Sequence, residues 1–226
     1  MVNRLQNKIV RINALLRKAY GPKARRSLRE PLDTLIETVL SQNTSDTNSH
    51  GAFLRLKVKF KSWEAAKRAG AGAIAKEIKS AGLYRIKSKR IHAILEQIHD
   101  VCGVTDLSSI KKMGGERAER FLKSFKGIGP KTLSIVMLFS LGLPYFPVDT
   151  HVLRVSKRLG LIPEKTNAKI AHDILGRLVP AGLMYEFHIN VIEHGRKLCK
   201  ASRPRCEVCP LRGICRWHAD IVSQKL

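Results

Sequence analysis

The sequence predicts an all-α protein, and three observations support this prediction. Apolar residues recur at helical spacing along most of the chain, as they do between Asn3 and Ala19. Short segments rich in glycine and proline, such as Gly21-Pro22 and Gly127–Pro130, separate these periodic stretches. No segment of useful length alternates apolar and polar residues as a half-buried strand would.

The expected helices follow one another along the chain. The first, Asn3–Ala19, places Ile9 and Ile12 on one face. The second, Thr34–Leu40, has Asp33 in the position of an N-cap, because a short acidic side chain can accept from the first free N–H groups. The same periodicity predicts further helices at Trp63–Arg68, Gly72–Ser80, Lys87–His99, Gly115–Ser124, Lys131–Leu141, Asp149–Leu159, Asn167–Leu178 and Tyr185–Cys199.

Length and composition exclude several classes of protein. A chain of 226 residues with 44% hydrophobic residues can bury a substantial core in one large or two small domains. No apolar run approaches the roughly 20 residues of a membrane-spanning helix, and the first residues lack the apolar core of a secretion signal. We therefore expect a cytoplasmic protein, associated with the nucleoid if the source is prokaryotic, with no membrane partner.

The charge is far from balanced. Lys and Arg number 42 against 18 Asp and Glu, which gives a formal charge of +24. A chain this basic repels itself, and a polyanionic partner such as DNA or RNA is the simplest reason for it. A thermophilic surface is an alternative, but such surfaces usually balance Lys and Arg with Glu. An anionic membrane is another, but the basic residues are not gathered on one amphipathic helix. The N-terminal segment 1–29 has no acidic residue; its basic ones are Arg4, Lys8, Arg11, Arg17, Lys18, Lys23, Arg25, Arg26 and Arg29.

A tight turn between two predicted helices is the first candidate site. Gly127 and Gly129 allow positive φ angles and a close approach of the backbone to a ligand. Pro130 suits the first turn of the second helix, whose free N–H groups form an anion site next to Lys131. The turn therefore suits a DNA phosphate, although a plain helix–turn–helix connection without a ligand is the alternative.

A carboxylate precedes a later helix. Asp149 is either an ordinary N-cap or a functional carboxylate that the helix dipole keeps ionised. Lys131 and Asp149 both lie at helix starts and could converge on one cleft, where a partly dry lysine would be neutral and nucleophilic. The alternative is that Lys131 only binds phosphate.

Four cysteines lie close together near the C-terminus: Cys199, Cys206, Cys209 and Cys215. In a chain without a secretion signal, clustered thiols indicate a metal site rather than disulfides. Thiolates suit zinc or an iron–sulfur cluster, and the spacing alone leaves both open. Arg203 and Arg205 lie in the loop and are expected to bind phosphate, with a solvated surface as the alternative. Cys102 lies far away and is expected to be a buried free thiol.

Two further motifs, Leu40-Ser-Gln42-Asn43-Thr44 and Gly82-Leu83-Tyr84, complete a pattern. Together with the hairpin, the Val148-Asp149-Thr150-His151 motif and the cysteine loop, they resemble the endonuclease III family of helix-hairpin-helix DNA glycosylases over nearly the whole chain. The resemblance implies two α-helical domains beside a DNA cleft. Residues 23–132 would form a six-helix barrel with the hairpin, and residues 1–22 and 133–226 an iron–sulfur cluster domain.

The same resemblance implies the roles of individual residues. Lys131 resembles the Schiff-base lysine and Asp149 the catalytic aspartate. Gln42 resembles the residue that fills the gap left by a flipped base, and Leu83 the wedge in the base stack. Gly127 and Gly129 resemble the phosphate-binding hairpin, and the four clustered cysteines the ligands of a 4Fe–4S cluster.

The implied activity is base excision by a bifunctional DNA glycosylase and AP lyase. Its partner would be double-stranded DNA with a damaged base, an oxidised pyrimidine by expectation, or an abasic site, and the protein would act as a monomer. Two alternatives remain open, a single-function glycosylase for a mismatched or modified base and a non-catalytic DNA-binding iron–sulfur protein. Pro130 and the Gln42 segment depart from common family patterns; the second departure leaves the preferred lesion open.

Overall fold

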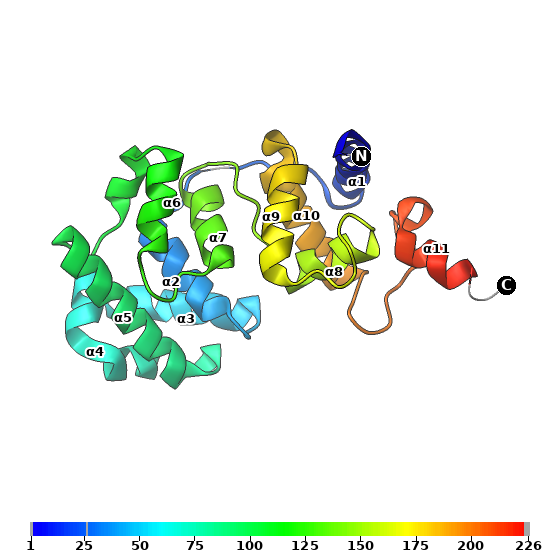
Figure 1. Cartoon of the computed structure of the whole chain (residues 1–226). Helices are drawn as coiled ribbons and strands as arrows, with labels where there is room; N and C mark the ends of the chain where they lie inside the picture. Colours follow the sequence, from blue (N-terminus) through cyan, green and yellow to red (C-terminus); the bar gives the residue numbers. More distant parts are fainter. Residues whose placement is uncertain (1, 26, 224–226) are drawn as a thin grey trace. The chain divides into compact units, whose positions relative to one another are not determined.

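The computed structural model describes residues 2–25 and 27–223, and every regular element in these ranges is a helix (Figure 1). The prediction of an all-α protein is confirmed. Arg26, one of the basic residues of the N-terminal segment, lies outside the described residues. The chain divides into two compact units, one formed by Met1–Ser27 with Pro144–Leu226 and the other by Leu28–Leu143. No helix among the described residues has both the length and the apolar character needed to cross a bilayer.

The unit Leu28–Leu143 is built around α2 (Pro31–Ser41), which packs against its neighbours α3, α5 and α7. Leu35, Ile36 and Val39 on α2 are fully buried, so this helix forms the centre of the core. Burial of each such side chain stabilises the fold by about 1.5–3 kcal/mol. The other helices are α3 (Asp46–Lys59), α4 (Trp63–Glu77), α5 (Tyr84–Cys102), α6 (Gly115–Lys123) and α7 (Pro130–Ser140), with short 3-10 turns η1 (Lys79–Ala81) and η2 (Ser108–Lys112).

The other unit is centred on α10 (Met184–Lys197), which packs against α1 (Val2–Tyr20) and α8 (Thr150–Arg158). Phe187 on α10 is fully buried and stacks on Phe146 with ring centroids 5.8 Å apart. This stack fixes the extended segment that leads into α8. The unit also contains α9 (Ala168–Leu178), α11 (Arg216–Ser223), η3 (Ala181–Leu183) and η4 (Arg212–Ile214).

Three expectations about local structure need correction. Asp33 is not an N-cap, because Pro31 is pre-organised for a first helical position and α2 begins there, with Glu30 as its N-cap. The Asp33 carboxylate instead accepts from Trp63 Nε1 at 2.7 Å and Lys57 Nζ at 2.9 Å. The helix α3 has no counterpart among the predicted helices, and neither does α11.

The predicted break in the Trp63–Ser80 region is confirmed. Gly70 interrupts α4 with φ 80° and ψ 169°, a conformation that only glycine adopts readily. The second half of the element ends at Glu77, and the 3-10 turn η1 follows where the prediction continued the helix to Ser80.

Alanine substitutions at Gly70 and Gly72 test this kink. We expect Gly70→Ala to lower the free energy of unfolding by about 1–3 kcal/mol, because alanine is strained in this backbone conformation. Steric clashes do not contribute, since a Cβ at this position would meet no atom within 4 Å. Gly72 has equally open surroundings and a helical backbone, so Gly72→Ala is expected to raise the free energy by about 0.4–1 kcal/mol. Urea unfolding measures both. Equal effects of the two variants would contradict the kink.

Candidate DNA interface and iron–sulfur centre

The hairpin predicted between Gly127 and Lys131 joins α6 to α7. Gly127 has φ 92°, which explains a glycine at this position. Gly129 does not have the expected positive φ: it is the extended N-cap of α7, with φ −87° and ψ 175°. A Cβ at Gly129 would meet no atom within 4 Å, so contacts within the chain do not require glycine there. Open space in front of this backbone suits close approach by an external ligand.

The start of α7 leaves its backbone donors available. Gly129 supplies no side-chain cap, and Pro130 occupies the first helical position. Lys131 follows in the first turn and is half-buried. The turn itself is fixed from outside, because Gln97 Oε1 on α5 accepts from the Lys126 N–H at 2.9 Å. The hairpin is therefore a rigid turn with a lysine and free N–H groups at its edge, an arrangement that binds anions.

Asp149 is the N-cap of α8, and its Oδ1 accepts from the Val152 N–H at 2.7 Å. The preceding backbone is held on both sides. The Val148 N–H donates to His172 Nε2 at 3.0 Å, and His188 Nδ1 lies 3.0 Å from the Pro147 carbonyl oxygen. Asp149 therefore has the N-cap position, one of its two expected roles, and its half-buried carboxylate sits at the positive end of a helix dipole.

Gln42 and Leu83 lie in two loops of the unit Leu28–Leu143 that are tied to each other. Gln42 is the C-cap of α2, and its side-chain Oε1 accepts from Arg90 Nη1 at 2.7 Å. Leu83 precedes α5 and is 54% exposed, so its apolar side chain is accessible from outside the chain. Thr44 of the first loop donates its hydroxyl to the Ala81 carbonyl of the second.

Backbone strain accumulates in these predicted DNA-binding loops. Among the described residues, the non-glycine residues with positive φ are Asn43 at 52°, Leu83 at 46° and Arg203 at 51°. The first is adjacent to Gln42 in sequence, and the other two are themselves predicted contacts. A non-glycine residue in this region costs about 1–3 kcal/mol, and such residues concentrate at functional sites.

A residue that the sequence analysis missed connects the two loops. Lys87 on α5 is only 4% exposed, and its Nζ donates to three oxygens: Leu40 O at 2.7 Å, Thr44 Oγ1 at 2.6 Å and Ala81 O at 2.6 Å. Burial lowers the pKa of Lys87. A buried lysine cannot be distinguished from a surface lysine by sequence in a chain this basic. The adjacent Ser88, which is also buried, is consistent with this inward face.

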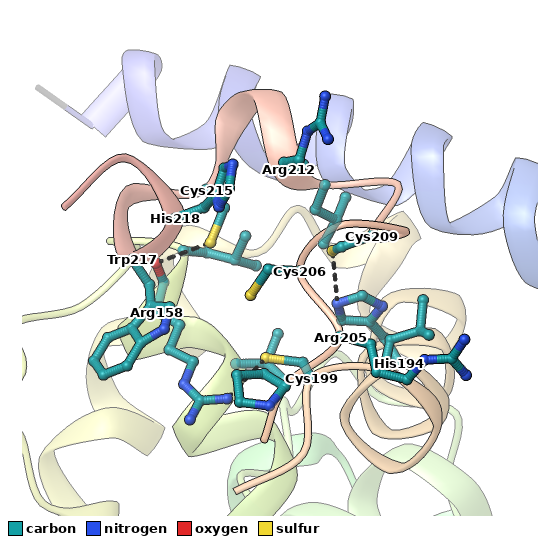
Figure 2. A pocket seen from close by; sticks show the side chains of 15 residues that line it. Arg158, His194, Cys199, Arg205, Cys206, Cys209, Arg212, Cys215, Trp217 and His218 are labelled. Carbon is teal, nitrogen blue, oxygen red and sulfur yellow. Dashed lines mark hydrogen bonds between the residues drawn. The ribbon is translucent and has the colours of Figure 1, made fainter. Parts of the chain in front are cut away.

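The clustered cysteines line one pocket of the other unit (Figure 2). All five cysteines of the chain are free thiols, as was expected for Cys102. The clustered cysteines are half-buried, and so is Cys102, which was expected to be buried. Within the described residues, no three Cys, His, Asp or Glu side chains are placed to hold a single metal ion. Four sulfurs bound to one zinc at about 2.3 Å would have to crowd around a point. Thiols spread around a pocket fit a polynuclear cluster better.

The surroundings of the pocket fit an anionic thiolate cluster. Arg158 Nη1 lies 3.4 Å from Cys199 Sγ, and Arg205 and Arg212 also line the pocket. Burial raises the pKa of the Cys209 thiol to about 11. A thiolate there therefore requires a coordinated cation, and the arginines offset the remaining negative charge.

A hydrogen-bonded chain extends behind one of the clustered cysteines, Cys209. His194 Nε2 lies 3.6 Å from Cys209 Sγ, and His194 Nδ1 lies 2.9 Å from the Tyr20 hydroxyl. Burial lowers the pKa of His194 to about 4 and raises the pKa of Tyr20 to about 12. The neutral imidazole can therefore accept from Tyr20 and donate to the sulfur, which fixes its tautomer.

Arg203 and Arg205 lie in the exposed loop between Cys199 and Cys206. The Arg205 N–H donates to Leu198 O at 3.0 Å, which anchors the loop to the end of α10. Gln42, Leu83 and the hairpin therefore belong to the unit Leu28–Leu143, whereas Asp149, the four clustered cysteines and these arginines belong to the other unit.

Comparison with known proteins assigns both regions. Residues 36–181 match the HhH-GPD superfamily base excision DNA repair protein model, and residues 199–215 match the iron–sulfur binding domain of endonuclease III. Endonuclease III of Sulfolobus acidocaldarius is 31% identical over 197 residues, which cover 86% of each chain. A longer Arabidopsis thaliana relative is 34% identical over 193 residues, which cover 81% of this chain and 66% of the relative. A trapped endonuclease III–DNA covalent intermediate superposes with a TM-score of 0.81 at 27% identity, covering 96% of this chain and 98% of that one.

Metal content tests the pocket directly. We expect the purified chain to be yellow-brown and to contain about four irons per molecule. Cys206→Ser should lose the iron, because a hydroxyl cannot replace the thiolate, and should bind DNA more weakly because the basic loop loses its anchor. Cys102→Ser, a half-buried cysteine outside the pocket, is the matched control and should retain the iron. Zinc without iron in the parent chain would contradict the assignment.

Proposed function

Because the chain belongs to the endonuclease III family of the HhH-GPD superfamily of base excision DNA repair proteins, we propose that its Lys131 and Asp149 carry out base excision and strand cleavage. The chain is an endonuclease III-like DNA glycosylase and AP lyase that binds damaged double-stranded DNA and contains a 4Fe–4S cluster. The roles of individual residues and the preferred lesion are proposals. The observation that supports them most is Lys131 at the uncapped start of α7, beside the open backbone of Gly129.

The reaction begins with extrusion of the damaged nucleotide, because C1′ cannot be reached inside a stacked duplex. We assign Gln42 to the space that the base leaves and Leu83 to the neighbouring stack. Unpairing costs least for a damaged or mispaired base, which contributes selectivity. The Gly127–Gly129 hairpin binds a backbone phosphate through N–H groups, and Arg203 and Arg205 bind phosphates elsewhere on the duplex.

Lys131 then acts as the nucleophile. Asp149 accepts a proton from the lysine ammonium, and the free amine attacks C1′. A bond forms between Nζ and C1′ while the glycosidic bond breaks, and the base departs with the bonding electrons and takes up a proton. Asp149 passes the proton that it accepted to the departing base, and its regenerated carboxylate then stabilises the positive charge on the sugar–lysine adduct.

The Lys131 adduct opens to a Schiff base, which makes a proton at C2′ acidic. Loss of that proton and departure of the 3′ phosphate by β-elimination cleave the strand, and water releases the lysine. Cys199, Cys206, Cys209 and Cys215 would hold the cluster, which orders the basic loop and takes no part in these steps. We also propose that the protein acts where chromosomal DNA lies, which is the nucleoid in a prokaryote.

The alternative of a single-function glycosylase, which uses water as nucleophile, has no need of an amine at position 131. A non-catalytic DNA-binding protein needs neither Lys131 nor Asp149. We assign an oxidised pyrimidine as the preferred lesion. Duplexes with single defined lesions, assayed separately for base release and strand cleavage, test this assignment. Preferred release of a mismatched or alkylated base would contradict it.

Borohydride reduction tests the nucleophile. With duplex DNA that contains an oxidised pyrimidine or an abasic site, the parent chain should form a covalent adduct. Lys131→Gln should abolish the adduct and bind DNA within about threefold of the parent, because one phosphate contact contributes modestly to the total. Lys126→Gln, an exposed lysine of the same hairpin, is the charge-matched control and should still form the adduct. Trapping by Lys131→Gln at the parent level would show that another group attacks C1′.

Asp149→Asn separates chemistry from folding. Asparagine caps helices about as well as aspartate, so the free energy of unfolding should change by less than about 1 kcal/mol. The amide cannot accept the lysine proton, and we expect base release to slow by about 10²–10⁴-fold. Single-turnover rates and urea unfolding measure the two quantities. An unchanged rate would leave Asp149 with the capping role alone.

A further inference from the structure

We propose that Lys87 is a positioning residue that holds the Gln42 and Leu83 loops in the arrangement that enters the DNA duplex. This inference rests on the roles proposed for Gln42 and Leu83. Its own basis is the geometry around one ammonium group. The three hydrogen bonds of Lys87 Nζ use all the donors that a protonated lysine has.

The three acceptors come from different segments. Leu40 O belongs to the last turn of α2, where helical carbonyls have no intrahelical partner. Thr44 Oγ1 lies in the loop after Gln42, and Ala81 O lies in the turn before Leu83. One side chain on α5 therefore joins the end of a helix to both loops.

A second set of bonds links the loops directly and depends on the first. The Thr44 hydroxyl accepts from Lys87 and donates to Ala81 O, so the lysine orients this hydroxyl. Gly82 packs close to the same atom: a Cβ at Gly82 would lie 3.7 Å from Thr44 Oγ1. Lys87, Thr44 and Ala81 form one network, and the ammonium group of Lys87 is its charged member, because all three acceptors are uncharged oxygens.

The strained residues lie at the edges of this network. Asn43 and Leu83 both have left-handed backbone conformations, which persist only where the surroundings determine them. The bonds from Lys87 attach on either side of Asn43, at Leu40 and Thr44, and two residues before Leu83, at Ala81. Without these bonds, the loops can relax and Leu83 can leave the position required for insertion.

The experiment uses a duplex with a reduced abasic site and 2-aminopurine as the adjacent base, whose fluorescence rises when it is unstacked. The full chain with its cluster should raise the signal on binding. Lys87→Met keeps the length of the side chain and removes the three donors, and we expect at least a fivefold smaller rise at saturating protein. Lys89→Met, an exposed position on the same helix, is the control that removes the same charge and should respond like the parent.

A merely structural role would not produce the second expected result, a dependence on base pairing. Lys87→Met should slow release of a paired lesion at least tenfold, whereas adduct formation at a preformed abasic site, which needs no base extrusion, should fall less than threefold. Equal losses on the two substrates would overturn the positioning role.

Substitutions at Thr44 keep the proposal testable if Lys87→Met does not fold. Thr44→Val removes the hydroxyl that accepts from the lysine and should reproduce both defects. Thr44→Ser keeps a hydroxyl, and its fluorescence rise and its rate of base release should equal those of the parent. Parent-level fluorescence in Lys87→Met or Thr44→Val overturns the positioning role alone. A parent chain that leaves 2-aminopurine stacked while trapping abasic DNA overturns the insertion roles of Gln42 and Leu83, and the positioning role with them.

Discussion

Long cationic side chains that donate to backbone carbonyls hold the irregular segments of this protein in place. A helical fold satisfies its own backbone except at the helix ends and in the loops, and the proposed DNA contacts lie in those places. Lys87 satisfies two carbonyls and a hydroxyl around the Gln42 and Leu83 loops. In the other unit, Arg154 donates to Cys199 O at 3.0 Å and Gly195 O at 2.9 Å, and Arg158 donates to Lys200 O at 2.7 Å and Ala201 O at 3.0 Å.

The basic composition therefore serves two purposes. Some cations act inside the protein, where their charge and reach replace the hydrogen bonds that loops lack. Arg158 also packs over the Trp217 ring at 4.9 Å and faces the cysteine pocket, so one side chain supports both the loop and the charge of a bound cluster. Other cations are exposed, and among them are Arg203 and Arg205, which we assign to phosphate. The net charge of the sequence predicts the contacts with phosphate, but it does not predict the internal hydrogen bonds.

The sequence predicts those parts of the fold whose signal is local. Helices such as α1 and α5 have continuous apolar faces, and the Asp149 cap follows from one residue before such a face. The helix α3 was missed because its sequence has a weak apolar face, with Ala52, Phe53 and Leu56 as its buried apolar residues. The Ser45 side chain, which accepts from the Asn48 N–H, is the capping signal that could have revealed its start. The role of Lys87 depends on acceptors up to 47 residues away in sequence, and no local pattern contains them.

The backbone conformations of three residues in the loops assigned to DNA give information that their hydrogen bonds do not give. Gly127 is explained by its positive φ, but Gly129 has an extended φ and open surroundings, so its backbone conformation and its contacts within the chain do not require glycine. Leu83 presents the opposite case, a bulky residue in a conformation that favours glycine. Neither residue is the one that suits its backbone conformation best. Alanine suits the extended conformation at position 129, and glycine suits the positive φ at position 83. These two features lie in the loops for which we propose contact with DNA, where a departure from the choice that suits folding best is expected.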